Sequence, residues 1–260
     1  MFNLKQLTLF LFLAIGTHTA FSQLGFSHEI GAIVGPVQFR SDFGVRDSGE
    51  TNFGNTGIGI GLIHYINFAY RADCNCYSTD TYFNDHFKLR SEISYNTTKL
   101  SHYGEWVEGN SENAQRLKDH TGEANNLDIG MQLEYFPLSI RAFQGFAYRV
   151  APFVSLGAHY TSFTPKAYTT HGEPNGINNP NNFWSHWLPG SINPASGSTW
   201  SVVTSIGARY KLTVLSDLMI DLRWQYYFSD WIDGLNHQLS SNKHNDWLLW
   251  LNFGYIYYLD

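Results

Sequence analysis

The sequence predicts an all-β protein: an eight-stranded antiparallel transmembrane β-barrel of the outer membrane, with a plugged polar lumen. Aromatic residues make up 17% of the chain and charged residues only 15%, whereas soluble domains usually contain about 25% charged residues. Eight segments alternate apolar and polar residues with period two, which indicates strands with one apolar face. The last segment, 246–260, has a wholly apolar face with aromatic residues near its end, as expected for a barrel-closing strand.

Residues 1–22 have the features of a secretory signal peptide, so the barrel domain is expected to comprise 23–260. Lys5 precedes an apolar run over 7–15, and a small-x-small cleavage site follows at 20–22. Beyond it, no apolar stretch of about 18 residues remains for a transmembrane helix. The net charge of −6 disfavours nucleic acid as a partner. A secreted β-sandwich is the alternative fold.

The first four strands are predicted at 28–35, 57–70, 86–97 and 126–136. Their apolar faces carry, in order, Ile30, Ala32 and Val34; Ile58, Ile60, Leu62, Ile66 and Phe68; Phe87, Leu89, Ile93 and Tyr95; and Leu127, Ile129, Met131, Leu133 and Tyr135. Their opposite faces carry Glu29 and Gly31; Gly57, Gly59, Gly61 and Asn67; Lys88, Arg90, Glu92, Ser94 and Asn96; and Asp128, Gln132 and Glu134. This alternation indicates strands exposed to two different environments.

The last four strands are predicted at 145–160, 199–211, 217–228 and 246–260. Their apolar faces carry Val150, Val154, Leu156, Ala158 and Tyr160; Trp200, Val202, Ile206, Ala208 and Tyr210; Leu218, Ile220, Leu222, Trp224, Tyr226 and Phe228; and Leu249, Leu251, Phe253, Tyr255, Tyr257 and Leu259. The polar faces include Ser155, His159, Ser201, Arg209, Asp221, Arg223 and Gln225.

The apolar faces end in Tyr, Trp or Phe, as at a membrane interface, which favours apolar side chains outside and polar ones inside. Strands of about ten residues match the hydrocarbon thickness when tilted. The long connections 36–56, 97–125, 161–198 and 229–245 are expected outside the cell. The connections 137–144 and 212–216 are expected in the periplasm, together with the unusually long 71–85.

A barrel of eight strands is just wide enough for its own side chains, so the inward charges are expected to form a sealed network. The predicted network consists of Arg90, Glu92, Gln132, Glu134, Arg209, Asp221 and Arg223. We expect Arg90 to lie near Glu134, and Arg209 to lie near Asp221 across a short turn. A proton or ion path is the alternative interpretation of this lumen.

No catalytic, cofactor-binding or metal site is predicted. His159 with Ser162 is the nearest approach to a base and a nucleophile, and a lipid-modifying enzyme is therefore kept as an alternative function. His64 falls on the lipid face between Leu62 and Ile66, where a polar group is costly. Either a bulge shifts its register, or His64 contacts a partner.

Cys74 and Cys76 lie in the connection 71–85, and the oxidising envelope makes a disulfide between them possible. Metal binding or redox chemistry is the alternative. Trp106, Trp184, Trp187 and Trp231 lie in the long loops. They are interpreted as the upper edge of the aromatic girdle, with sugar or partner binding as the alternative.

The terminal strand resembles the β-signal that the barrel-assembly machinery reads, through Asn252, Gly254, Tyr257 and Leu259. Together with 27–36, 87–96 and 131–139, this strand resembles an uncharacterised family of small Bacteroidota outer-membrane barrels. The strand number and chain length are also similar to the small barrel of the type IX (Por) secretion system.

That resemblance implies a non-enzymatic accessory component in the outer membrane, which docks partners of an envelope protein export or assembly complex. The expected partners are outer-membrane lipid, proteins of that complex and the barrel-assembly machinery. A lipid-modifying enzyme and a loop-based ligand-binding or adhesion protein are the alternatives.

Overall fold

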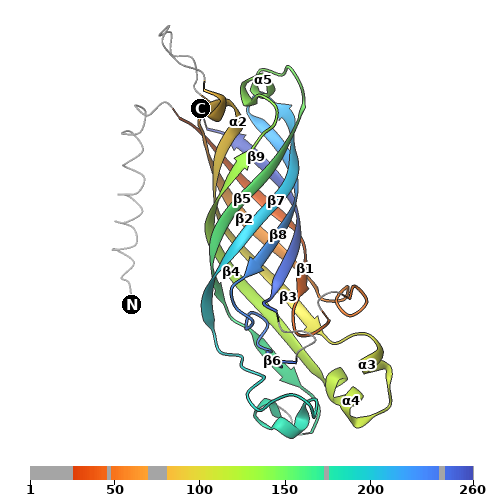
Figure 1. Cartoon of the computed structure of the whole chain (residues 1–260). Helices are drawn as coiled ribbons and strands as arrows, with labels where there is room; N and C mark the ends of the chain where they lie inside the picture. Colours follow the sequence, from red (N-terminus) through yellow and green to blue (C-terminus); the bar gives the residue numbers. More distant parts are fainter. Residues whose placement is uncertain (1–25, 46–47, 70–80, 173–175, 240–243, 260) are drawn as a thin grey trace, which may run out of the picture.

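In the computed structural model, the chain forms a closed antiparallel β-barrel with folded loops at one end (Figure 1). The structure describes residues 26–45, 48–69, 81–172, 176–239 and 244–259. One sheet contains nine strands in the order β3-β2-β1-β9-β8-β7-β5-β4-β6, and pairing of β3 with β4 closes it. Eight of these strands form the wall, as predicted. The signal peptide 1–22, Cys74 and Cys76 lie outside the described residues.

Six of the eight wall strands extend further toward the folded loops than the sequence predicted, and β8 and β9 end within one residue of the prediction there. Their bounds are β1 (Ser27–Arg40), β2 (Thr56–Asn67), β3 (Phe87–Ser101), β4 (His120–Tyr135), β5 (Val150–Phe163), β6 (Lys166–Thr169), β7 (Gly197–Thr213), β8 (Ser216–Tyr227) and β9 (Trp247–Tyr258). The fifth strand begins at Val150 instead of residue 145, because helix α5 (Ile140–Gln144) and a turn precede it. The turn contains Phe146 at a φ of 60°, which interrupts an extended chain.

The short strand β6 was not predicted, and it continues β5 along the edge of β4. β4 pairs with β5 from Asn126 onward and with β6 up to Glu123. Pro165 lies between β5 and β6, where it interrupts the ladder because proline has no N–H to donate. The β-structure of this hairpin therefore extends beyond the barrel into the loops (Figure 1).

Short helices occur only at the two ends of the described barrel. They are α2 (Tyr82–His86) and α5 at one end, and α3 (Glu105–Glu108), α4 (Glu112–Asp119), η2 (Gly176–Asn178) and η3 (Pro180–Asn182) at the other. Helix α4 begins after Ser111, whose hydroxyl accepts a hydrogen bond from the Ala114 amide at 3.1 Å. No helix among the described residues is long and apolar enough to cross a membrane.

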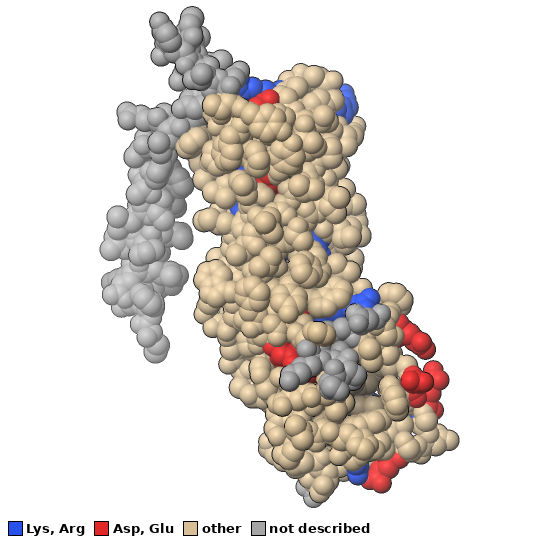
Figure 2. Space-filling model, viewed as in Figure 1, with Lys and Arg blue, Asp and Glu red and all other residues tan. Residues whose placement is uncertain are grey.

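The two faces of the wall are inverted relative to a soluble protein. Apolar side chains point outward in every wall strand, and they include Ile60, Leu62, Met131, Leu156 and Ile206, each more than half exposed. Figure 2 shows few charged atoms over the barrel wall in view, while acidic side chains gather at the loop end. An apolar surface of this extent fits acyl chains and would be unfavourable in water.

Aromatic side chains gather near both edges of this apolar belt. The exposed aromatic residues on the loop side are Tyr95, Tyr160, Trp200, Trp224 and Phe228, and those on the other side are Tyr82, Phe83, Tyr210, Tyr255 and Tyr257. Trp200 and Tyr160 pair across β7 and β5, with ring centroids 5.4 Å apart. Such girdles mark the two membrane interfaces.

Apolar layers close the interior above and below the charged centre. At the end that carries both described chain ends, Ile140 and Phe143 of α5 are buried near Phe136. At the loop end, Phe39, Tyr227 and Trp250 are fully buried, and the rings of Phe39 and Tyr227 stack at 6.1 Å. The lumen is therefore plugged, with polar groups at the centre and apolar groups toward the ends.

Candidate functional site

Arg90 lies at the centre of the lumen and contacts carboxylates from three strands. Its Nη2 lies 2.7 Å from Glu92 Oε2, and its Nη1 lies 3.4 Å from Glu134 Oε1 and 3.3 Å from Asp221 Oδ2. Arg223 donates two further bonds to Glu92, at 2.7 Å and 2.6 Å. All five side chains are fully buried, so each charge depends on its partners.

Arg209 forms a second centre closer to the chain ends. Its guanidinium contacts Glu29 at 2.6 Å and Glu134 at 3.2 Å, and it lies 4.0 Å from the centre of the Tyr65 ring. Gln132 also lies in the lumen, where it accepts a hydrogen bond from the Ser155 hydroxyl at 2.9 Å and lies beside His159. These contacts link five wall strands across the lumen, which makes the interior a structural plug.

Arg90 contacts Glu134, as predicted. Arg209 and Asp221 occupy diagonal positions on the lumen face of the β7–β8 ladder, but Arg209 forms its ion pairs with Glu29, Glu134 and Asp217. Arg209 faces Met219 in the register of β7 with β8, and Asp221 faces Gly207. Asp221 instead binds Arg90 and accepts a hydrogen bond from Asn252 Nδ2 at 2.8 Å. Long side chains in a narrow barrel reach across it, so neighbouring strands do not determine the partners.

The sequence offered one candidate for nucleophilic catalysis, and the structure separates its members. His159 points into the lumen and is fully buried, with its Nε2 lying 3.3 Å from Gln132 Nε2. Ser162 is exposed on the outer face. Residues of opposite parity in a strand point to opposite faces, so these two cannot form a base–nucleophile pair.

His64 lies on the outer face as predicted, but its polar partner belongs to the same chain. Its Nε2 lies 3.1 Å from His28 Nδ1, and the two rings stack with centroids 5.3 Å apart. Strands β1 and β2 pair without a register shift at this position, so the bulge alternative is wrong. The His28 ring gives His64 a hydrogen-bond partner on the outer face, and contact of His64 with another protein stays a prediction.

Three residues of the proposed assembly signal lie on the two faces of β9, and Leu259 follows directly after it. Asn252 points inward to Asp221, and Gly254 lies close to Ile33 and Met219. Tyr257 and Leu259 are exposed, at 43% and 54%. In the folded barrel Tyr257 contributes to the aromatic girdle, while recognition of these residues during assembly stays a prediction.

The four long loops fold together into a single unit, which we call the head. It comprises the described parts of 41–55, 102–119, 164–196 and 228–246. Hydrogen bonds join these loops, or the strand ends beside them, into a ring: Ser101 N to Asn55 Oδ1 (2.9 Å), Asn113 Nδ2 to Ser185 Oγ (2.9 Å), Asn236 N to Ser191 O (2.7 Å) and His237 N to Asp42 Oδ2 (3.1 Å). Every loop is therefore bonded to two neighbours.

An aromatic cluster holds the centre of the head. Phe43 stacks between His102 and His120, with centroid distances of 4.7 Å and 4.9 Å. Trp187 contacts His120 at 5.5 Å and His237 at 6.0 Å. The rings come from all four loops or the adjoining end of β4, which projects beyond the barrel, so they lock the loops together.

The two central histidines are uncharged at neutral pH. His102 Nε2 and His120 Nδ1 lie 3.0 Å apart, so one ring donates a hydrogen bond to the other. Burial lowers the pKa of His102 to about 3 and that of His120 well below its ordinary value, because an imidazolium loses its hydration there. The head therefore contains a neutral, aromatic interior.

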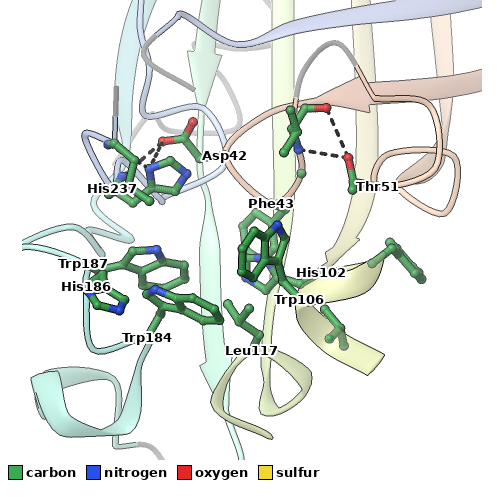
Figure 3. A pocket seen from close by; sticks show the side chains of 15 residues that line it. Asp42, Phe43, Thr51, His102, Trp106, Leu117, Trp184, His186, Trp187 and His237 are labelled. Atoms are coloured by element: carbon green, nitrogen blue, oxygen red, sulfur yellow. Dashed lines mark hydrogen bonds and ion pairs between the residues drawn. The ribbon is translucent and has the colours of Figure 1, made fainter. Parts of the chain in front are cut away.

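A pocket of about 320 Å³ opens in the head and is lined by residues from all four loops (Figure 3). Figure 3 shows Trp184 and Trp187 of the third loop facing Phe43 of the first and Trp106 of the second. The indoles of Trp106 and Trp184 meet edge to face at 5.9 Å. The pocket is a concave, aromatic site of the kind that binds small molecules.

The interpretation of the loop tryptophans as girdle residues is wrong for Trp106, Trp184 and Trp187, which line this pocket instead. Trp231 packs partly buried against the core of the barrel. Sequence periodicity missed the pocket because its residues lie in irregular segments, although clustered Trp and His residues in long loops were a usable signal. Among the described residues, no group of three or more His, Cys, Asp or Glu could hold a metal ion.

No protein-family model and no curated protein matches the chain. One similar solved structure is Ail of Yersinia pestis, with 10% identity, coverage of 91% of this chain and 100% of that chain, and a TM-score of 0.43. A second is neisserial surface protein A, with 13% identity, coverage of 88% of this chain and 96% of that chain, and a TM-score of 0.44. A third is a major outer membrane protein from Thermus thermophilus, with 14% identity, coverage of 89% of this chain and 99% of that chain, and a TM-score of 0.46. At these scores the likeness carries no argument about function.

The closed barrel, its apolar belt and its sealed charged interior define this chain as an outer-membrane β-barrel protein. The backbone bonds of the wall are satisfied around the whole cylinder, as a lipid environment requires. The barrel anchors the head at one membrane surface.

Proposed function

We propose that the protein is a non-enzymatic outer-membrane protein that binds a ligand in the pocket of its head. The observation that carries this proposal is the convergence of all four loops on one pocket. Because hydrogen bonds and ring contacts already order these loops, little conformational entropy is lost when a ligand binds. A volume of about 320 Å³ lies within the range of small-molecule sites.

The head faces the exterior of the cell in this proposal. In outer-membrane barrels the short turns lie in the periplasm and the longer loops outside. The described turn between β7 and β8 is short and lies at the opposite end from the head. The ligand would therefore arrive from the medium or from the cell surface.

This proposal favours the loop-based alternative of the sequence analysis over the accessory docking role. Docking within a type IX-like export complex rests on the resemblance alone, and co-purification from native membranes tests it. The alternative of a lipid-modifying enzyme rested on His159 as base and Ser162 as nucleophile, and these two residues lie on opposite faces of β5.

A ligand screen on the full-length barrel in a maltoside detergent tests the proposal. Ligand-detected NMR against cationic, anionic and neutral small molecules should yield hits that weaken in Trp184→Ala. The same hits should persist in Trp200→Phe, which changes a lipid-facing tryptophan instead. A screen in which no compound distinguishes the two variants would refute ligand binding in this pocket.

A further inference from the structure

Several aromatic rings converge in the head pocket. Trp106, Trp184 and Trp187 line it together with Phe43 and Tyr103. The face of an aromatic ring carries negative electrostatic potential, and indole attracts a cation most strongly. A positive group held within about 6 Å of such faces is stabilised, and more so where water is excluded.

The carboxylates around the pocket are negative, which is the sign that attracts a cation. Its lining contains no Lys or Arg among the described residues, whereas it does contain the carboxylate of Asp42. Glu105 and Glu108 flank Trp106 in α3, at the loop end where Figure 2 shows acidic side chains. His102 adds no positive charge at neutral pH, because burial lowers its pKa to about 3. His237 lies 3.9 Å from the Asp42 carboxylate, and an anion would find no Lys or Arg among the described residues of this lining.

Three polar side chains of the lining, those of Asp42, Thr51 and His102, are already hydrogen-bonded. Asp42 accepts a hydrogen bond from the amide of His237, and Thr51 exchanges hydrogen bonds with the backbone of Val45. His102 is bonded to His120. A sugar depends on several free donors and acceptors for its recognition, and these three side chains are not free to supply them.

We infer that the head pocket binds an organic cation, with a quaternary ammonium group seated against the faces of Trp106, Trp184 and Trp187. The inference rests on the proposed function and adds the chemical class of the ligand. A quaternary ammonium has no N–H group to satisfy, which fits a lining that combines ring faces and a carboxylate with few free acceptors.

Choline and its neutral isostere 3,3-dimethylbutan-1-ol test this inference, because they share one shape and differ in charge. Binding to the full-length barrel in maltoside is measured by tryptophan fluorescence and calorimetry. We expect choline to bind about 10-fold more tightly than the alcohol, a factor equivalent to about 1.4 kcal/mol. Trp184→Phe, which keeps a ring at this position, should weaken choline several-fold, and Trp200→Phe should leave it unchanged.

Equal affinities for the two compounds, or no binding of choline, would overturn the inference. The result also separates this inference from the proposed function. If neutral or anionic compounds bind in the head and choline does not, the pocket remains a ligand site and its charge preference is wrong. If compounds of every class fail to bind, both are wrong.

Discussion

Replacing Glu92 by Gln should destabilise the barrel strongly, because this carboxylate holds two buried guanidinium groups. Glu92 receives one bond from Arg90 at 2.7 Å and two from Arg223 at 2.7 Å and 2.6 Å. Gln keeps the shape of Glu but removes the negative charge, and its amide N–H₂ would face the donors of an arginine. The change therefore leaves uncompensated positive charge at the centre of the lumen.

The expected loss is about 3–5 kcal/mol, the usual cost of breaking a buried ion pair by removing one partner. Arg90 keeps two other carboxylate contacts, Glu134 and Asp221, at 3.4 Å and 3.3 Å. Arg223 has Glu92 as its ion-pair partner among the described residues and otherwise stacks over Trp250 at 4.8 Å. Most of the loss should therefore arise from Arg223.

Urea unfolding of the full chain in lipid vesicles measures this loss. Glu123→Gln is the matched control, because Glu123 pairs with Lys166 at 3.2 Å in the β4–β6 ladder, where both side chains are partly exposed, and its replacement should cost at most about 1 kcal/mol. Adding Arg223→Gln to Glu92→Gln should recover part of the loss, because the orphaned charge is removed. The reasoning fails if Glu92→Gln lies within about 0.5 kcal/mol of wild type.

Two further predictions concern the head and the seam of the barrel. Below pH 6.5, the ordinary pKa of histidine, an opened head gains a proton on His102 that the folded head excludes, because burial lowers the pKa of His102 to about 3. Head stability therefore falls as the pH is lowered, by about 2 kcal/mol at pH 5 from this residue. Hydrogen exchange of the loops should accelerate at pH 5 while the wall stays protected, and equal protection at pH 5 and pH 8 would contradict this. Gly35→Ala should cost about 1–3 kcal/mol, because an added Cβ meets the backbone carbonyl of Leu251 at the seam of β1 with β9. Thermal unfolding should show a lower melting temperature for Gly35→Ala than for Gly109→Ala, because the added Cβ of Gly109→Ala would make only an ordinary contact. Equal melting temperatures of the two variants would contradict the expected steric clash at Gly35.

The wall strands were predictable because each residue obeys a local rule. In a one-layer cylinder between lipid and lumen, parity alone assigns Leu62 to the outside and Arg90 to the inside. His64 obeyed the same rule, but the position of its partner His28 depended on the register between β1 and β2. Similarly, Asp221 was correctly placed inside the barrel, and its partner Arg90 came from across the lumen.

The sequence by itself determined the all-β class, the inverted polarity of the wall and the set of charged residues inside it, since period-two alternation is a property of consecutive residues. Only the tertiary structure decided which charges pair, that β5 continues into β6, and that Trp106, Trp184 and Trp187 share a pocket. The physical reason is distance along the chain. These contacts join residues from loops and strands far apart in sequence, and no local periodicity encodes how such segments meet.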